Sequence, residues 1–80
     1  MTDREMTPKQ GQYLAYIHYY TKLMRQAPSE ADFRRYFGVT PPTVHQMILT
    51  LEQKGFIARE PGRPRSIRLL VAREEFPDLE

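Results

Sequence analysis

Proline and glycine residues divide this chain into a fixed order of segments. Pro28 separates two helical patterns, Gly38 ends the second of them, and Gly55 ends a third. Pro61-Gly62 then supplies the residues that a type II turn prefers, proline at its second position and glycine at its third. The apolar spacing between these points predicts helices over about 8–25, 29–37 and 41–54, and strands over 56–60 and 66–71. The chain is therefore expected to adopt an α+β fold, with three helices before a two-stranded antiparallel hairpin.

Each helix is expected to begin at a residue that can cap it. Thr7 precedes a proline, and Gln10 stands where a capping box requires Glu or Gln. Ser29 is the expected cap of the second helix, with acids in the first turn behind it. The third helix begins near Thr40-Pro41-Pro42, and either Thr40 or Pro41 is the boundary residue, because a residue before proline avoids the α region. In both cases the two prolines remove two backbone donors from this helix start.

Apolar residues at helical spacing predict which helix faces are buried. On the first helix the expected core residues are Tyr13, Leu14, Ile17, Tyr20 and Met24, whereas Tyr16 and Tyr19 fall partly outside the stripe. On the second they are Phe33, Tyr36 and Phe37, and on the third Val44, Met47, Ile48 and Leu51. The single core that these residues form predicts one domain over 7–71, between a flexible N-terminus at 1–6 and an acidic, mobile tail at 72–80.

Charge is unevenly distributed, although the net charge is only +2. Six basic residues and one acid lie between Lys54 and Arg73, and four acids follow between Glu74 and Glu80. A basic stripe in a balanced protein indicates a polyanion site, and the same stripe also fits a solvated hairpin.

Several classes of protein are not indicated by this composition. The chain has no cysteine, no metal-ligand spacing around His18 and His45, and no glycine-rich phosphate loop. It also has no apolar run of the length that a signal peptide or membrane span needs. We therefore expect a soluble cytoplasmic protein that is not an enzyme and has neither a cofactor nor a metal.

The outward face of the third helix carries the candidate base contacts. Pro42, His45 and Gln46 share the side opposite the buried stripe, with Thr43 at its edge. Glutamine can bond adenine N6 and N7, histidine can donate to guanine, and threonine offers a methyl for thymine or a hydroxyl for phosphate. A phosphate at this helix start is expected to use the hydroxyl of Thr40 or Thr43, or the Thr43 N–H.

The candidate phosphate contacts are arginines of the second helix and the hairpin. We expect one of Arg34 and Arg35 to reach the backbone of a nucleic acid, although simple solvation also accounts for the pair. The hairpin arginines are expected to clamp phosphates or to enter the adjacent minor groove; they are Arg59, Arg63 and Arg65.

Five motifs together resemble a known family. They lie at 7–10, 27–33, 43–45, 51–57 and 64–70, and include Thr43-Val44-His45. They are similar to the N-terminal DNA-binding domain of LexA repressors, over about 7–70 and most specifically over 43–70. The resemblance implies a winged helix-turn-helix that binds palindromic operators as a dimer, with the third helix in the major groove. Pro42 and Gln46 differ from the residues usual in the family, so a different operator is expected.

The family also has a second domain, with a serine–lysine dyad for self-cleavage and the dimer contacts. Because this sequence stops at Glu80, we expect neither self-cleavage nor that route to a dimer. The sequence thus predicts a small transcriptional regulator, a repressor in type, that binds double-stranded DNA. The alternative is a protein-interaction module, in which Tyr16, Tyr19 and Leu49 form an exposed apolar patch.

Overall fold

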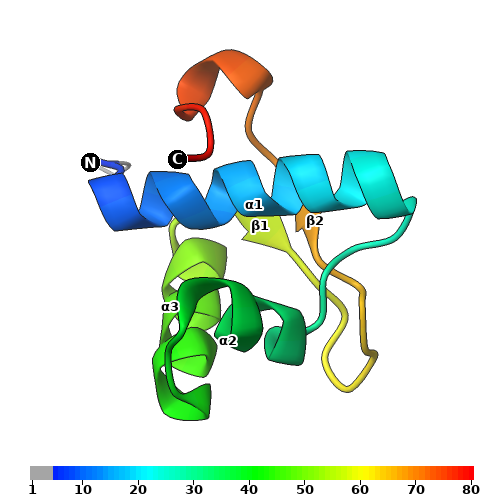
Figure 1. Ribbon diagram of the computed structural model, residues 1–80. Coiled ribbons are helices and arrows are strands. Elements are labelled where there is room, and N and C mark those ends of the chain that lie inside the picture. The colour runs from blue at the N-terminus through cyan, green and yellow to red at the C-terminus, as the bar shows by residue number, and fades with distance from the viewer. Residues whose placement is uncertain (1–4) are drawn as a thin grey trace.

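The computed structural model describes residues 5–80, and three helices and a two-stranded sheet make up most of it (Figure 1). The elements are α1 (Pro8–Met24), α2 (Glu30–Phe37), α3 (Pro41–Gln53), β1 (Ile57–Ala58), β2 (Arg68–Leu69) and the short 3₁₀ helix η1 (Arg73–Glu75). The hairpin of β1 and β2, at 57–69, is called the wing. Helix α1 crosses the middle of the molecule, with α2, α3 and the tip of the wing on one side and η1 on the other. The expected α+β fold is confirmed. Residues 1–4 of the expected flexible N-terminus lie outside the described residues.

The predicted helix starts are confirmed by reciprocal capping bonds. The Thr7 hydroxyl accepts from the Gln10 N–H, and the Gln10 side chain accepts from the Thr7 N–H. Ser29 and Asp32 form the same capping box at α2. The sequence pattern had indicated Ser29 as the cap, but it had not indicated Asp32 as its partner.

Helix α3 begins with both prolines inside its first turn. Thr40 is the N-cap, with extended backbone angles of φ −82° and ψ 160°, and Pro41 and Pro42 follow as the first two helical residues. Thr40 is thus the boundary residue of the two alternatives. Thr43 supplies the first backbone N–H of the helix, because neither proline has one.

The core lies where α1 meets α2, α3 and β1. Leu14, Ile17, Phe33, Ile48 and Leu51 are all at most 1% exposed. Two predictions for α1 were wrong. Met24 is 56% exposed, since it lies in the last turn beyond the reach of α2 and α3, and Tyr16 is only 8% exposed.

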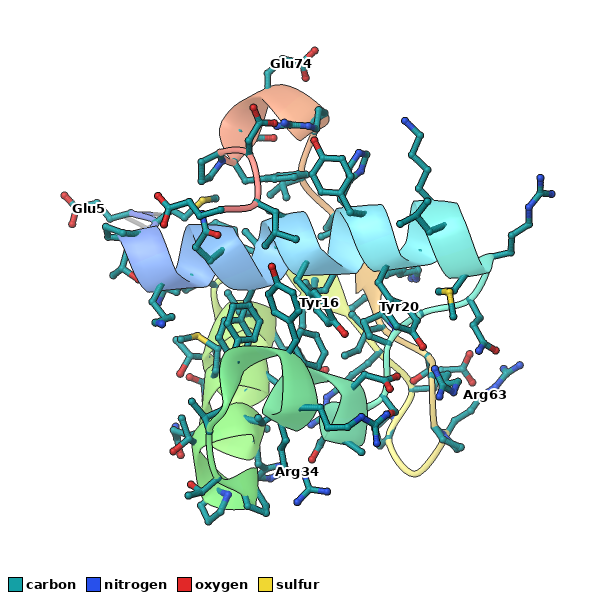
Figure 2. The ribbon with its side chains drawn as sticks, viewed as in Figure 1. Glu5, Tyr16, Tyr20, Arg34, Arg63 and Glu74 are labelled. Atoms are coloured by element: carbon teal, nitrogen blue, oxygen red, sulfur yellow. The ribbon has the colours of Figure 1, made fainter. Side chains whose placement is uncertain are left out.

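Tyr16 is buried because α2 packs rings against it. Its ring stacks on Tyr36 at 4.6 Å and lies 5.2 Å from Phe33, and its hydroxyl donates to the Asp32 carbonyl at 3.3 Å. Figure 2 shows Tyr16 directed from α1 toward α2. Tyr16 is therefore not available to the exposed apolar patch that the alternative, a protein-interaction module, was expected to form with Tyr19 and Leu49. On α2 itself, Tyr36 is 46% exposed, and Phe33 carries the buried contact.

The wing is shorter than the predicted strands. Ile57 pairs with Leu69 and Ala58 pairs with Arg68, and the N–H of Leu70 adds a bond to the carbonyl of residue 56 at 2.8 Å. Beyond them the chain turns at Pro61-Gly62, where Gly62 has a φ of 76° and the Arg63 N–H bonds the Glu60 carbonyl at 3.1 Å. The predicted turn is thus confirmed.

A serine side chain replaces the missing ladder bonds near the tip of the wing. The Ser66 hydroxyl accepts from the Glu60 N–H at 3.0 Å and lies 3.2 Å from the Glu60 carbonyl and 2.8 Å from that of Arg63. The strands end early because this bonding, together with Pro61 and Pro64, takes the place of regular pairing.

The segment expected to be a mobile acidic tail packs against α1 in the structure. Phe76 is 5% exposed and belongs to the core cluster, with its ring 5.7 Å from that of His18. Gln12 donates to the Asp78 carbonyl at 3.1 Å, and the Glu80 N–H donates to Gln12 at 2.9 Å. Figure 1 shows η1 on the side of α1 that faces away from α2 and α3, and the chain then returns to α2 at its last residue, where the Tyr36 hydroxyl donates to the Glu80 carbonyl at 3.2 Å.

Candidate nucleic-acid interface

The first half of α3 exposes the four residues predicted for base contact. Pro42, Thr43, His45 and Gln46 are all exposed, while Val44 and Ile48 on the opposite face of the helix are fully buried. The helix is held by these two side chains, so its outer face is fixed relative to the core. An exposed, rigidly supported helix face of this kind can enter a major groove, which admits one α-helix.

The start of α3 has few backbone donors, and its two threonines bond each other. The hydroxyl oxygens of Thr40 and Thr43 are 2.9 Å apart, and Thr40 makes no side-chain capping bond. One of the two hydroxyls donates to the other, which leaves the second hydrogen for another acceptor. The helix start can therefore offer a hydroxyl and the Thr43 N–H to a phosphate.

An acid from α2 lies next to His45. Glu30 Oε2 is 3.5 Å from His45 Nδ1, and both side chains are about half exposed. The outer face of α3 carries no acid of its own, so the sequence pattern of that helix gave no sign of this neighbour. The contact places the Nδ1 edge of the ring toward α2 and the Nε2 edge away from it.

Four of the five candidate arginines form ion pairs. Arg35 pairs with Asp32 at 2.7 Å, Arg59 with Glu52 at 3.2 Å, Arg63 with Glu60 at 3.0 Å, and Arg65 with Asp32 at 3.0 Å. Arg34 is exposed and pairs with none of the acids that the structure describes.

The exposure of these pairs separates them into two kinds. The side chains of Arg63 and Arg35 are 68% and 75% exposed, whereas those of Arg59 and Arg65 are 21% and 36% exposed. An exposed ion pair contributes about 0–1 kcal/mol, so a phosphate can replace the carboxylate at Arg63 at little cost. Arg34, Arg35 and Arg63 are thus the arginines best placed to meet a polyanion.

Arg34 and Arg63 lie on the same side of α1, and Glu74 lies on the other (Figure 2). The side with the arginines also carries α2, the start of α3 and the tip of the wing (Figure 1). A hollow of about 350 Å³ separates the wing from α2 and α3, and its lining includes Ser29, Arg59 and Arg63. The sequence-predicted residues on α3, α2 and the wing are thus brought to one side of the molecule, where Arg34, Arg35 and Arg63 are exposed.

Asp32 lies at the centre of a bonded group that the sequence did not reveal. Its carboxylate accepts from the Ser29 N–H at 2.9 Å and from two arginines, Arg35 and Arg65. Burial alone raises the pKa of Asp32, but the hydrogen bonds of Ser29 and Tyr20 and the charge of Arg65 outweigh burial and lower this pKa from 3.8 to about 2.

The lowered pKa of Asp32 predicts a loss of stability in acid. A carboxyl whose pKa is depressed by folding stabilises the native state above its unfolded pKa of 3.8 and loses this contribution as the pH falls toward 2. We expect the contribution to be about 2 kcal/mol at pH 5. Urea unfolding of the wild type and of Asp32→Asn between pH 2 and pH 5 measures it: the gap in unfolding free energy should narrow as the pH falls. A gap that is constant over this range would contradict the assignment.

The part of the chain that the structure describes shows no group of acidic, histidine or cysteine side chains that could hold a metal ion. Within the same residues, no helix has both the length and the apolar character needed to cross a membrane.

Comparison with known proteins agrees with the observed fold. Residues 3–66 match the family of the LexA DNA-binding domain. The chain is 35% identical over 73 residues to the LexA repressor of Thermosipho melanesiensis, covering 91% of this chain and 37% of that protein. It is 37% identical over 67 residues to that of Thermosipho africanus, covering 84% of this chain and 34% of that protein, and 34% identical over 73 residues to that of Exiguobacterium sibiricum, covering 90% and 36%.

The chain spans about a third of the length of the curated relatives it matches. The matched part includes all three helices and the wing up to Ser66, and so contains every candidate contact residue described above. The family match and the observed fold lead to the same conclusion: this chain belongs to the family of LexA DNA-binding domains.

Proposed function

We propose that this protein binds double-stranded DNA in a sequence-specific manner and acts as a transcriptional repressor. The observation that carries the proposal is that the exposed half of α3, Arg34 of α2 and Arg63 of the wing all lie on one side of α1. The matched family is named for DNA binding, and the relatives are named as repressors.

In the proposed complex, α3 enters the major groove and reads bases with three side chains. The amide of Gln46 contacts adenine, Thr43 contacts a thymine methyl or a phosphate, and His45 reads with its Nε2 edge, because its Nδ1 edge faces Glu30. Pro42 lies in the first turn without a donor, so it contributes an apolar contact only.

Phosphate contacts in this complex come from α2, from the start of α3 and from the wing. Arg34 and Arg35 approach one strand from α2, the hydroxyl of Thr40 approaches at the helix start, and Arg63 approaches the neighbouring phosphates or minor groove from the wing. Such contacts fix the register of the protein on the duplex but carry no sequence information themselves.

Selection of bound duplexes from a random pool tests the proposal directly. We expect an enriched site whose affinity falls as the salt concentration rises. A palindrome in that site would support the further proposal that two copies of the chain bind together, each on one half-site. Recovery of no site, together with no salt-dependent retention on any duplex, would overturn DNA binding.

Replacing Gln46 or His45 by alanine tests the base contacts. Each change should cost about 1–3 kcal/mol of binding free energy on the selected site and relax base preference at one position. The matched control is Gln53→Ala, since Gln53 is also exposed on α3 but lies in its last turn. Fluorescence anisotropy with the selected site and with single-base variants measures both effects. Unchanged base preference in the two variants would show that α3 reads the site with other residues.

A further inference from the structure

Arg65 has a backbone conformation that is unusual for a residue with a side chain. Its φ is 55°, in the left-handed region that favours glycine. Among the described residues, the other non-glycine residue with a positive φ is Arg25, which caps the end of α1. A strained backbone conformation of this kind persists where surrounding contacts hold it. The contacts of the Arg65 side chain therefore indicate the role of this residue.

The guanidinium of Arg65 bonds three segments that are distant in sequence. Its Nη1 shares its two hydrogens among three acceptors: the Tyr20 hydroxyl of α1 at 3.1 Å, the Ala27 carbonyl between α1 and α2 at 3.1 Å, and Asp32 Oδ2 of α2 at 3.0 Å. Figure 2 shows Tyr20 on the side of α1 that faces the wing. One side chain of the wing thus joins the wing to both helices at their junction.

The acceptors of Arg65 are themselves fixed. Asp32 is 6% exposed, and its carboxylate also closes the capping box of α2 with Ser29. The Ala27 carbonyl belongs to a buried residue beside the buried Pro28. Because these acceptors belong to the packed part of the molecule, the bonds restrain the wing relative to the helices.

Arg63 is in the opposite situation. Its partner Glu60 belongs to the same wing turn, three residues earlier, and both side chains are about two-thirds exposed. The Arg63–Glu60 pair therefore moves with the wing and does not restrain it. Two arginines that are two residues apart in sequence thus differ in role: one faces solvent from the wing, and the other holds the wing in place.

We propose that Arg65 is a positioning residue for DNA binding, which ties the wing to the junction of α1 and α2 and so determines where Arg63 stands relative to α3. The proposal rests on the DNA-binding function proposed above. It replaces the expectation from sequence that Arg65 itself clamps a phosphate. It also gives Tyr20, a residue of α1, and the buried Asp32 an effect on DNA affinity.

A double-variant cycle separates positioning from direct contact. Arg63→Ala should reduce the slope of log K against log salt by about 0.9, the loss of one phosphate contact. Arg65→Gly should reduce the slope and the affinity to a similar extent, and the double variant should lose no more than either single variant. Glycine suits the φ of residue 65, so the backbone at this position stays unstrained, and urea unfolding verifies that the variant is folded. A double variant that loses twice the slope would overturn the proposal, because Arg65 would then contact a phosphate of its own.

The free protein gives a test that does not depend on DNA. ¹⁵N relaxation should show lower order parameters at the Arg63 and Ser66 amides in Tyr20→Phe than in the wild type. The matched control is Tyr19→Phe, because the Tyr19 hydroxyl bonds Arg73 and Asp78 on the other side of α1. If the order parameters fall in Tyr20→Phe but the protein binds no duplex, the restraint of the wing by Arg65 is supported and the proposed function is overturned. If the order parameters are unchanged and the protein binds its site, only the restraint by Arg65 is overturned.

Discussion

Replacing Phe76 by alanine is expected to lower the free energy of unfolding by about 3–5 kcal/mol, the usual cost of removing a buried aromatic ring. The Phe76 ring is 5% exposed, contacts the core cluster, and lies under the Arg73 guanidinium at 5.0 Å. Domains of this size have total stabilities of the same order, about 4–12 kcal/mol, so the variant should be partly unfolded near 37 °C. The physical reason is that Phe76 covers apolar surface of α1 that neither α2 nor α3 reaches.

Urea unfolding followed by circular dichroism measures this effect. Phe76→Leu should cost much less, because leucine retains most of the buried apolar area. Glu74→Ala should change stability by no more than about 0.5 kcal/mol, since Glu74 is exposed in the same segment. A Phe76→Ala protein as stable as Glu74→Ala would mean that the C-terminal segment does not pack on α1 in solution.

Replacing Gly11 by alanine is expected to destabilise the protein by about 1–3 kcal/mol, the usual cost of overpacking. In an exposed helix the same change would stabilise by about 1 kcal/mol, because alanine is the better helix former. Here a Cβ on Gly11 would lie 2.7 Å from Pro77 Cδ and 3.0 Å from Pro77 Cγ. The proline ring cannot rotate away, so the C-terminal segment must shift and disturb the packing of Phe76.

The control for Gly11 is a second substitution that removes the two ring carbons. In a Pro77→Ala background, Gly11→Ala should recover the ordinary gain of about 1 kcal/mol, so the sign of the effect should reverse. Thermal unfolding of the four proteins in this cycle gives the coupling between residues 11 and 77. Equal effects of Gly11→Ala in both backgrounds would show that the two residues do not touch.

The parts of the fold that the sequence predicted are those set by local rules. Three such features each depend on residues a few positions apart. They are the capping box of Thr7 and Gln10, the left-handed Gly38 at the end of α2, and the turn at Pro61-Gly62. Backbone sterics and capping bonds act within one or two turns, so such features can be read from neighbouring residues alone.

The errors concern contacts between distant segments. Helical spacing indicated that Tyr16 was at the edge of the core stripe, but the rings that bury it belong to α2. The same spacing assigned Met24 to the core, although Met24 is 56% exposed in the last turn of α1. Periodicity defines a face of a helix but not how far its neighbours extend along it.

The candidate site shows the same division. The helical periodicity of α3 predicted its exposed face, because it assigned Val44 and Ile48 to the core. The sequence could not predict the partners of Arg65 and His45, because Asp32 and Glu30 are 33 and 15 residues away from them. A count of arginines in the wing could not distinguish one that faces solvent from one that bonds the helices.

The placement of Arg34 and Arg63 on one side of α1 and of Glu74 on the other has a kinetic consequence. With a net charge of only +2, the molecule as a whole is weakly attracted to a polyanion, and most of the arginines near α3 are paired with acids. The exposed Arg34, Arg35 and Arg63 therefore supply the local attraction to a duplex, whereas Glu74 lies on the other side of α1. This attraction favours approaches in which α2 and the wing face the duplex, so more collisions are productive. The attraction extends over about one Debye length, about 10 Å at 0.1 M salt. The increase in association rate should therefore vanish at high salt, while the geometry of the docked complex stays the same.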